Sequence, residues 1–365
     1  MSEWQTFCLK DLGKIVGGAT PPTNNPKNYG NKIAWITPKD LSTLQGRYIK
    51  KGNCSISRLG FKSCSCVLLP KHAILFSSRA PIGYVAIAEK RLCTNQGFKS
   101  IIPNKKIYFE FLYYLLKYHK DNISNIGGGT TFKEVSGATL GLFQVKIPPT
   151  YYEQQKIART LSVLGQKIEN NHKINELLHN FAHKVYEYYF KYKPKNAKLE
   201  QIIIENPKSS IMVKNAQKTQ DKYPFFTSGD NTLSYPKAII DGRNCFLNTG
   251  GNAGIKFYVG KASYSTDTWC ICANEFSDYL YLLLSSIKTH INQSFFQGTS
   301  LKHLQKNLLK KYPIYMPSAH EIKKFNQIIM PLLTLISINT RTSKKLEQIR
   351  DFLLPLLLKQ QVKPQ

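Results

Sequence analysis

The sequence contains two copies of one pattern, and this internal duplication limits the possible folds more than any other feature. Residues 129–133, Gly-Thr-Thr-Phe-Lys, recur at 298–302 as Gly-Thr-Ser-Leu-Lys. Residues 94–98, Thr-Asn-Gln-Gly-Phe, correspond to Ser-Thr-Asp-Thr-Trp at 265–269, with almost the same separation between the copies. A chain of 365 residues is long enough for two domains, so the duplication predicts two halves with similar folds.

Each copy ends in a stretch in which apolar residues recur at alternating intervals of three and four. The first stretch runs from Glu153 to Phe190, and the second from Glu321 to about Leu358. Five consecutive steps of this kind in each stretch are typical of a coiled-coil seam. The predicted seam residues, which we also expect to serve in subunit docking, are Ile157, Leu161, Leu164, Ile168, Asn171 and Leu178 in the first stretch, and Phe325, Ile329, Leu332, Ile336, Asn339 and Leu346 in the second.

Polar residues interrupt the two seams at the same place. They are Asn171 and Asn175 in the first seam and Asn339 and Ser343 in the second. Buried polar residues in a seam fix its register at some loss of stability.

The second stretch also fits a plain buried helix, because further apolar residues widen its apolar stripe. These further residues are Ile328, Leu333, Leu335, Ile349 and Phe352. Pro331 and Pro355 predict that this helix kinks or ends early.

The segments before the two helices have mixed character. Strand-like runs are predicted at residues 33–36, 66–69, 83–88, 255–259 and 269–272, and helices at 108–119 and 277–287. We therefore expect an α+β fold in the order domain, helix, domain, helix. The predicted boundaries are 1–150 for the first domain, 151–196 for the first helix, 197–318 for the second domain and 319–365 for the second helix.

The chain is strongly basic. Fifty-one Lys and Arg residues stand against 22 Asp and Glu residues, which gives a net charge of +29. Such an excess is relieved by a polyanionic partner, and nucleic acid is favoured over an acidic membrane surface or a lysine-biased composition. The sequence contains no apolar run of about 18 residues and no signal peptide. We therefore expect no membrane partner and a cytoplasmic location.

The eight cysteines are expected to be reduced in such a compartment. Cys64 and Cys66, like Cys270 and Cys272, are two residues apart in runs that resemble strands. This spacing is poor for a zinc knuckle. Buried small side chains are favoured over a metal site, and we expect no metal.

The glycine-rich stretch at residues 127–135 suggests an anion site, but its spacing does not match a nucleotide-binding P-loop. Its second copy at residues 298–302 keeps an anion site as an interpretation, and the net charge favours a phosphate of nucleic acid as that anion. Thr130 or Thr131 could cap the following segment, whose free N–H groups favour an anion. Lys133 and its counterpart Lys302 add positive charge. A flexible turn with a capping threonine is the alternative interpretation.

Several segments make the chain resemble the specificity subunits of type I restriction–modification systems. They are residues 35–41 (Trp-Ile-Thr-Pro-Lys-Asp-Leu), 77–83 (Ser-Ser-Arg-Ala-Pro-Ile-Gly), 94–98, 129–131, and Pro148-Pro149 leading to Glu-Gln-Gln-Lys-Ile at 153–157. The resemblance covers essentially the whole chain. The second copy departs from the pattern, because Arg-Ala-Pro-Ile-Gly at 79–83 is replaced by Gly-Gly-Asn-Ala-Gly at 250–254 and the glutamine pair is missing.

The resemblance implies two target-recognition domains joined by two antiparallel helices that form a coiled coil. It also implies a subunit that reads an asymmetric, bipartite site in double-stranded DNA and assembles with methyltransferase (modification) and motor-nuclease (restriction) subunits. Such a subunit has no cofactor of its own, and S-adenosylmethionine is expected in the methyltransferase subunit. Because a 38-residue helix (153–190) spans on the order of 55 Å, the helices could set the distance between the half-sites.

The candidate DNA contacts are polar and basic residues of the repeated segments. Arginine suits guanine, and Asn or Gln suits adenine. The candidates for base reading are Arg79, Asn95, Gln96 and Lys99 in the first domain, and Asn252, Lys256, Thr266 and Asp267 in the second. The candidates for backbone contact are Thr130, Thr131, Lys133, Thr299, Ser300 and Lys302.

Catalytic motifs are not found in the sequence. His179 and His183 have the spacing of a zincin helix but lack its glutamate, and no tetrapeptide of amino-methyltransferases is present. The main hypothesis is a DNA-reading and assembly subunit without catalytic residues. Two alternatives stay open at this point: a stand-alone methyltransferase or nuclease with a disguised site, and an RNA-binding coiled-coil protein.

Overall fold

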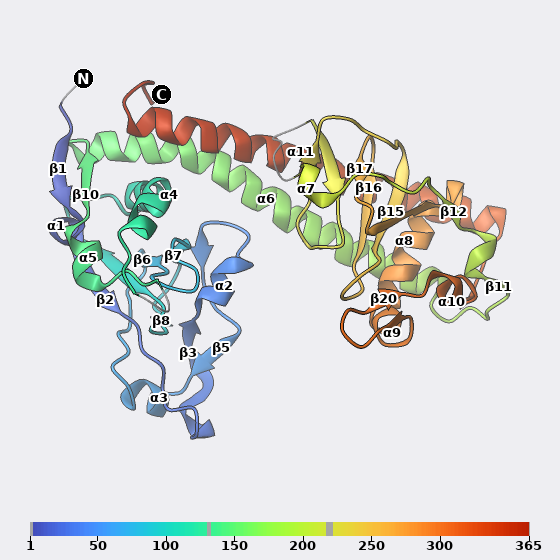
Figure 1. The fold of residues 1–365 in the computed structure, drawn as a ribbon, viewed down its shortest axis with the longest axis horizontal. Helices are drawn as coiled ribbons and strands as arrows, with labels where there is room; N and C mark the ends of the chain where they lie inside the picture. Colours follow the sequence, from blue (N-terminus) through green and yellow to red (C-terminus); the bar gives the residue numbers. More distant parts are fainter. Residues whose placement is uncertain (1–2, 130–132, 217–221, 365) are drawn as a thin grey trace. The chain divides into compact units, whose positions relative to one another are not determined.

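The computed structural model describes residues 3–129, 133–216 and 222–364 and divides into two compact units (Figure 1). Unit 1 contains residues 1–170 and 343–365, and unit 2 contains residues 171–342. The division passes through both long helices instead of following the domain limits expected from the sequence. Each half of a helix buries its apolar face in the unit to which it belongs, and therefore neither helix forms a unit of its own.

Unit 1 is built on a five-stranded sheet. Its strand order is β2 (Gly13–Gly17), β9 (Lys99–Pro103), β6 (Ile74–Phe76), β7 (Val85–Ala88) and β4 (Tyr48–Ile49). Neighbouring strands are antiparallel except β4 and β7, which are parallel. A second sheet has the order β5 (Cys54–Ile56), β3 (Tyr29–Ile36) and β8 (Cys93–Thr94). Helix α4 (Phe109–Asn125) contacts β6 and β7, and β1 (Gln5–Cys8) pairs with β10 (Gln144–Ile147). The shorter helices are α1 (Leu9–Leu12), α2 (Pro38–Ser42), α3 (Arg58–Lys62) and α5 (Gly137–Leu142).

Unit 2 repeats this plan with a smaller sheet. Its antiparallel strands have the order β12 (Ile204–Glu205), β18 (Thr268–Cys272), β15 (Arg243–Asn248) and β16 (Ile255–Val259). A second sheet has the order β14 (Leu233–Tyr235), β13 (Tyr223–Phe226) and β17 (Ser263–Tyr264). Two short pairs are β11 (Ala197–Lys198) with β21 (Pro313–Ile314) and β19 (Phe296–Gln297) with β20 (His303–Leu304). The helices are α7 (Val213–Ala216), α8 (Ser277–Ser286), α9 (Lys288–Ser294) and α10 (Lys306–Lys310).

The duplication seen in the sequence is therefore a duplication of topology. The antiparallel strands β9, β6 and β7 of unit 1 correspond to β18, β15 and β16 of unit 2. The parallel pair of β3 with β8 corresponds to the pair of β13 with β17. The predicted α+β fold is confirmed, and so are the strand runs except residues 66–69. Residues 66–68 form no strand, and the Cys66 thiol contacts the backbone oxygen of Ala19 at 2.9 Å.

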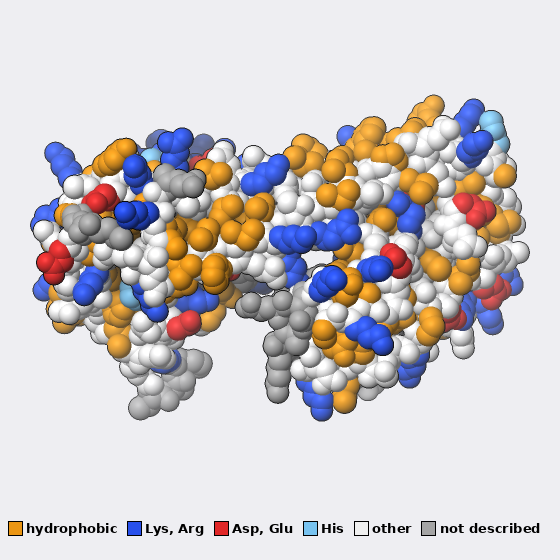
Figure 2. All heavy atoms as spheres, turned by 90° about the horizontal axis from the view of Figure 1, so that it is seen from above, with side chains coloured by type: hydrophobic (Ala, Val, Ile, Leu, Met, Phe, Trp, Pro, Cys, Tyr) orange, Lys and Arg blue, Asp and Glu red, His pale blue; other side chains and the backbone are white. Residues whose placement is uncertain are grey.

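The surface carries the charge excess of the sequence. On the face drawn in Figure 2, Lys and Arg side chains greatly outnumber Asp and Glu side chains, and hydrophobic patches lie between them. Within the described ranges, no helix is long and apolar enough to cross a membrane.

The two long helices, α6 (Tyr151–Phe190) and α11 (Ala319–Leu358), begin within two residues of the predicted starts. At both beginnings the residue before the helix is hydrogen-bonded to the glutamate three positions later, and for α11 these bonds form a capping box. Thr150 Oγ1 donates to the Glu153 carboxylate at 3.0 Å and accepts from the Glu153 N–H at 3.2 Å. The N–H of Ser318 donates to the Glu321 carboxylate at 3.0 Å, and this bond is the main reason why the pKa of Glu321 is lowered to about 2. Of the expectation that Pro331 and Pro355 kink or end the second helix, the ending is wrong, because both prolines lie inside α11.

The helices run antiparallel within each unit, as predicted. In unit 1 the first part of α6 shares a buried cluster with the last part of α11, through Ile157, Leu161, Leu354 and Leu357. In unit 2 the last part of α6 meets the first part of α11, where the rings of Phe190 and Phe325 lie 4.9 Å apart. Of the predicted seam residues, Ile157, Leu161, Ile168, Asn171, Phe325, Ile329 and Ile336 are buried, and Leu164, Leu178, Leu332, Asn339 and Leu346 are half-buried.

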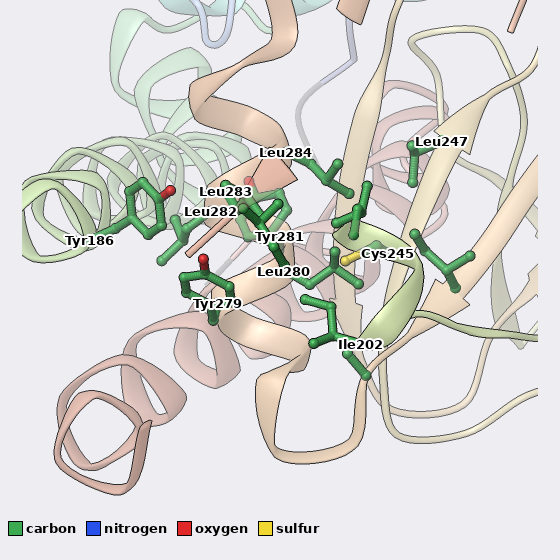
Figure 3. Packing of buried hydrophobic residues seen from close by; sticks show 14 of the residues in the cluster. Tyr186, Ile202, Cys245, Leu247, Tyr279, Leu280, Tyr281, Leu282, Leu283 and Leu284 are labelled. Carbon is green, nitrogen blue, oxygen red and sulfur yellow. The ribbon is translucent and has the colours of Figure 1, made fainter. Parts of the chain in front are cut away.

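The core of unit 2 joins its sheet and α8 to both long helices. Figure 3 shows α8 residues, among them Tyr279 and Leu280, packed between the sheet residue Cys245 and Tyr186 of α6. Leu333 of α11, which the sequence placed outside the simple seam, is buried in the same cluster. The broad apolar stripe on α11 is therefore explained in part by contact with the domain.

Candidate nucleic-acid interface

Three loops of unit 1 meet at one place, and we call them loop cluster 1: residues 77–83, residues 94–98, and a third loop of which residues 127–129 and 133–135 are described. The backbone of Ser78 joins all three loops. Its N–H donates to the Gly97 carbonyl at 2.8 Å, and its carbonyl accepts from the Val135 N–H at 3.0 Å. The three segments that the sequence analysis selected from separate places in the chain therefore form one surface.

A glutamate organises the basic side chains of loop cluster 1. Glu134 accepts from Arg79 at 3.4 Å and from Lys99 at 3.3 Å. All three side chains are partly exposed, so this ion-pair group is accessible from solvent. Arg79 and Lys99, predicted as base readers, are thus brought together, but a DNA phosphate or base must compete with Glu134 for them. Sequence reasoning missed Glu134, although it lies in the glycine-rich stretch at residues 127–135.

Asn95 and Gln96 lie on a turn that is held from both sides. Asn95 Oδ1 accepts from the Gly97 N–H at 3.0 Å, and the Asn95 N–H donates to the Ile36 carbonyl at 2.9 Å. A Cβ atom on Gly18 would lie 2.0 Å from the backbone oxygen of Asn95, so only glycine permits this approach. Gln96 is exposed and accepts a hydrogen bond from Thr20.

The glycine-rich loop is only partly described. Thr130 and Thr131, predicted for backbone contact, lie outside the described residues. On either side of them, Gly128 and Glu134 exchange two backbone hydrogen bonds, at 2.9 and 3.1 Å. Lys133 is exposed, so its ammonium group is available to a phosphate.

Unit 2 contains the corresponding loop cluster 2: residues 248–254, 265–267 and 298–304. Thr249 is the counterpart of Ser78 in the repeat and has the same joining role. Its carbonyl accepts from the Leu304 N–H at 3.0 Å. Its N–H and its hydroxyl both donate to the Asp267 carbonyl, at 3.2 and 2.7 Å. The Gly251 N–H donates to the Lys302 carbonyl at 2.9 Å, so the three loops again form one surface.

Most predicted contacts of unit 2 lie exposed on loop cluster 2, namely Asn252, Thr266, Thr299, Ser300 and Lys302. Lys256 is different, because its ammonium group points inward. It donates to the Thr227 carbonyl at 2.6 Å, to the Gly229 carbonyl, and to Asn248 Oδ1 at 3.3 Å. Burial lowers the pKa of Lys256. The side chain therefore links the loop at 227–229 to Asn248, which is the last residue of β15 and the first of loop cluster 2.

Both clusters offer backbone turns, amides and ammonium groups to a ligand. This is the chemistry that binds phosphates and the edges of bases. In the part of the chain that the structure describes, no group of three or more His, Cys, Asp or Glu side chains is placed to hold a metal ion.

Comparison with known proteins places both halves in one family model. The model described as "Type I restriction modification DNA specificity domain" matches residues 1–180 and 195–348. The specificity subunit of the type I restriction enzyme MjaIX from Methanocaldococcus jannaschii is 32% identical over 408 residues, covering 98% of this chain and 93% of that protein. The HindI specificity subunit from Haemophilus influenzae is 30% identical over 177 residues, covering 46% of this chain and 38% of that protein.

Among solved structures, the crystal structure of a type I restriction–modification S subunit from M. genitalium has the same fold. The TM-score is 0.65 at 17% sequence identity, and the match covers 97% of this chain and 96% of that chain.

Proposed function

This chain belongs to the family of type I restriction–modification specificity subunits, and we propose that it reads a bipartite, asymmetric DNA site with one loop cluster for each half-site. The observation that carries this proposal is the repetition of the three-loop arrangement. Ser78 and Thr249 join equivalent loops in the two units, while the exposed side chains around them differ. Two similar frames with different side chains are suited to reading two different short sequences.

The spacer between the half-sites is assigned to the long helices. Each of them is one continuous helix of 40 residues that contributes to both units. A helix has a fixed rise per residue, whereas a flexible linker would allow many distances. Continuous helices therefore support a site with one fixed spacer length.

The partner subunits are proposed to dock on the long helices. In unit 2, α6 leaves Ile174, Leu177 and Phe181 exposed; the first two come one residue before the predicted seam positions Asn175 and Leu178, and Phe181 continues the same spacing. In α11, Ile328, Leu335 and Ile338 are exposed, and each of them also comes one residue before a predicted seam residue. Because the two helices are antiparallel, residues displaced equally from both seams lie on one face of the pair. Exposed apolar patches of this kind mark protein interaction sites.

We assign this face to a methyltransferase subunit, which would hold the S-adenosylmethionine, and expect a motor-nuclease subunit to join the complex. The family membership makes this chain a non-catalytic subunit and so disfavours a stand-alone methyltransferase or nuclease. It also favours duplex DNA over RNA as the ligand. We also propose a cytoplasmic location, which agrees with eight cysteines in the thiol form.

The test is methylation of a random-sequence DNA library by this chain together with its methyltransferase subunit. Sequencing of the methylated molecules should reveal two unlike half-sites at one fixed spacing. Each subunit alone should methylate nothing specifically. Methylation by this chain alone, or a methylated site with a single uninterrupted sequence, would overturn the proposal.

A further inference from the structure

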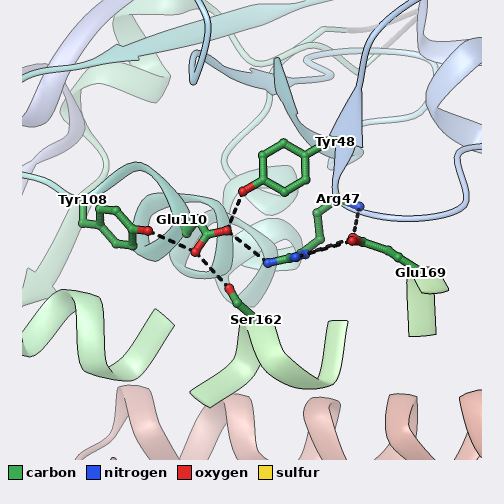
Figure 4. A network of polar contacts seen from close by, with 6 residues as sticks. All are labelled: Arg47, Tyr48, Tyr108, Glu110, Ser162 and Glu169. Carbon is green, nitrogen blue, oxygen red and sulfur yellow. Dashed lines mark hydrogen bonds and ion pairs between the residues drawn. The ribbon is translucent and has the colours of Figure 1, made fainter. Parts of the chain in front are cut away.

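Arg47 joins the first recognition domain to α6 through a buried ion-pair network (Figure 4). Its Nε lies 3.0 Å from Glu169 of α6, and its Nη1 lies 3.1 Å from Glu110 at the beginning of α4. The backbone N–H of Arg47 also donates to the Glu169 carboxylate, at 2.9 Å. The Arg47 side chain is only 7% exposed, so solvent hardly weakens these contacts.

Glu110 is the centre of the same network. It accepts hydrogen bonds from the hydroxyl groups of Tyr48, Tyr108 and Ser162 (Figure 4), and Ser162 belongs to α6. Burial, followed by the hydrogen bond to Glu110, raises the pKa of Tyr48, so its hydroxyl stays a donor. A Cβ atom on Gly165 of α6 would lie 3.0 Å from the Arg47 Nε, so the glycine leaves room for the guanidinium group.

A second, half-buried arginine joins the recognition domain of unit 2 to α11. Arg243, at the start of β15, forms a bidentate ion pair with Asp278 in the first turn of α8. Its Nη1 donates to the Thr334 hydroxyl at 2.9 Å, and its Nη2 donates to the Met330 carbonyl at 3.1 Å. Thr334 and Met330 both belong to α11. The guanidinium group thus bridges the domain and the helix, as Arg47 does in unit 1.

The two networks use equivalent positions on the helices. Glu110 and Asp278 correspond in the repeat, and each is the second residue of its helix. Glu169 and Ser337 lie equally far from the starts of α6 and α11, and each accepts a backbone N–H from the domain. The donor to Ser337 is the Val259 N–H, at 3.1 Å.

The two arginines, by contrast, come from different places in the repeat. Arg47 directly precedes β4, whereas Arg243 begins β15, whose counterpart in unit 1 is β6. The duplication alone therefore does not explain why both units have this bridge.

We infer that Arg47 and Arg243 are positioning residues: each clamps its recognition domain in one orientation on its long helix, and the two clamps together restrict the complex to one spacer length. The inference rests on the proposed function. Bidentate and three-way contacts of a guanidinium group fix angles as well as distances. None of the clamp residues belongs to loop cluster 1 or 2, so the clamps act on spacing and leave the bases read at each half-site unchanged.

The test is the random-library experiment with clamp variants in the full complex. Glu169→Ala removes the helix partner of Arg47, and Thr334→Val removes one acceptor of Arg243. Glu176→Ala, an exposed glutamate on the same helix α6, is the matched control. We expect the fraction of methylated molecules with a spacer one base pair too long or too short to rise at least tenfold in both clamp variants, with both half-sites unchanged. The control should keep the wild-type spacer.

Two results would overturn the inference. One is a clamp variant that methylates DNA with the wild-type spacer distribution, even if its melting temperature is lower. The other is a variant that changes the bases of a half-site. If Glu169→Ala does not assemble, Arg47→Lys replaces it in the test. This variant keeps the charge but loses the bidentate geometry, and its spacer distribution is compared with that of wild type in the same way. A wild-type complex without a bipartite site refutes the proposed function, and this outcome is independent of the variants.

Discussion

The side-chain amide of Asn339 donates a hydrogen bond to Asn175 Oδ1 at 3.0 Å, across the two long helices of unit 2. Asn175 in turn donates to the Thr340 hydroxyl at 3.3 Å. The two asparagines lie at seam positions that the sequence marked as polar interruptions. Because a pair of amides forms these bonds in only one alignment of the helices, we infer that the pair sets the register of the seam.

This relationship predicts how Asn175 and Asn339 act on stability. Asn175→Leu leaves the half-buried Asn339 amide without its acceptor, and we expect a loss of about 1–2 kcal/mol in the free energy of unfolding. The double variant Asn175→Leu/Asn339→Leu should recover most of that loss, since no polar group is left unpaired. Urea unfolding of the three proteins measures both values. A double variant that is no more stable than Asn175→Leu would mean that the two side chains do not act as a pair.

Lys133 and Lys302 are expected to bind DNA phosphates. Replacing either with Ala should weaken binding to all sequences alike and reduce the slope of log K against log salt by about 0.9. Lys167→Ala, on the exposed face of α6, serves as the control. Fluorescence anisotropy of the complex at several salt concentrations gives the slopes. A changed base preference with an unchanged slope would assign these lysines to base reading instead.

Lys256 should affect one half-site only. Lys256→Met removes the donor for three oxygens beneath loop cluster 2 and leaves these oxygens unsatisfied. We expect the half-site read by unit 2 to be lost or relaxed by roughly tenfold or more in affinity, a cost of about 1–3 kcal/mol, while the other half-site is read as before. Competition binding with DNA mutated in each half-site measures the two effects separately. Equal weakening at both half-sites would contradict a local role.

Because the side chain of Lys117 in α4 has a lowered pKa, we expect the stability of the chain to depend on pH. Burial, followed by repulsion from Arg350, lowers its pKa to about 8, from an ordinary value of 10.5. The folded chain therefore holds this proton less tightly than the unfolded chain, and the free energy of unfolding rises as the pH increases from about 8 to about 10.5. Lys117→Met should be more stable than wild type at pH 7, by about 1–3 kcal/mol.

The stability difference between Lys117→Met and wild type should close as the pH approaches 10. Urea unfolding at a series of pH values measures it. Lys105→Met, at an exposed lysine of the same unit, should show no such difference. A difference that is constant with pH would mean that the methionine stabilises by packing and not by removing a buried charge.

The parts of the fold that depend on local pattern could be predicted from the sequence. The heptad spacing located both long helices, since the apolar residues of a helix face recur at intervals of three and four. Pro331 does not end α11, because a single lost backbone hydrogen bond does not end a helix whose apolar face is buried on both sides of the proline. Tertiary packing outweighs local preference at such positions.

The candidate site was predictable only in outline. The repeat identified the loops, but the sequence could not show that Glu134 pairs with Arg79, or that Lys256 points inward. These contacts join residues far apart in the chain, as Arg47 and Glu169 do over 122 positions. Pairings of this kind depend on how the domain packs against the helix, and they leave no periodic pattern in the sequence.

The measurement that tests the central claim most directly is methylation mapping after a domain exchange. Residues 197–318 are replaced with the equivalent domain of a relative such as the M. jannaschii specificity subunit, and the hybrid is combined with the same methyltransferase subunit. If each unit reads one half-site independently, the half-site read by unit 2 changes, while the other half-site and the spacer length stay the same. If both half-sites change together, the two units read DNA jointly, and the account of two separate recognition units is wrong.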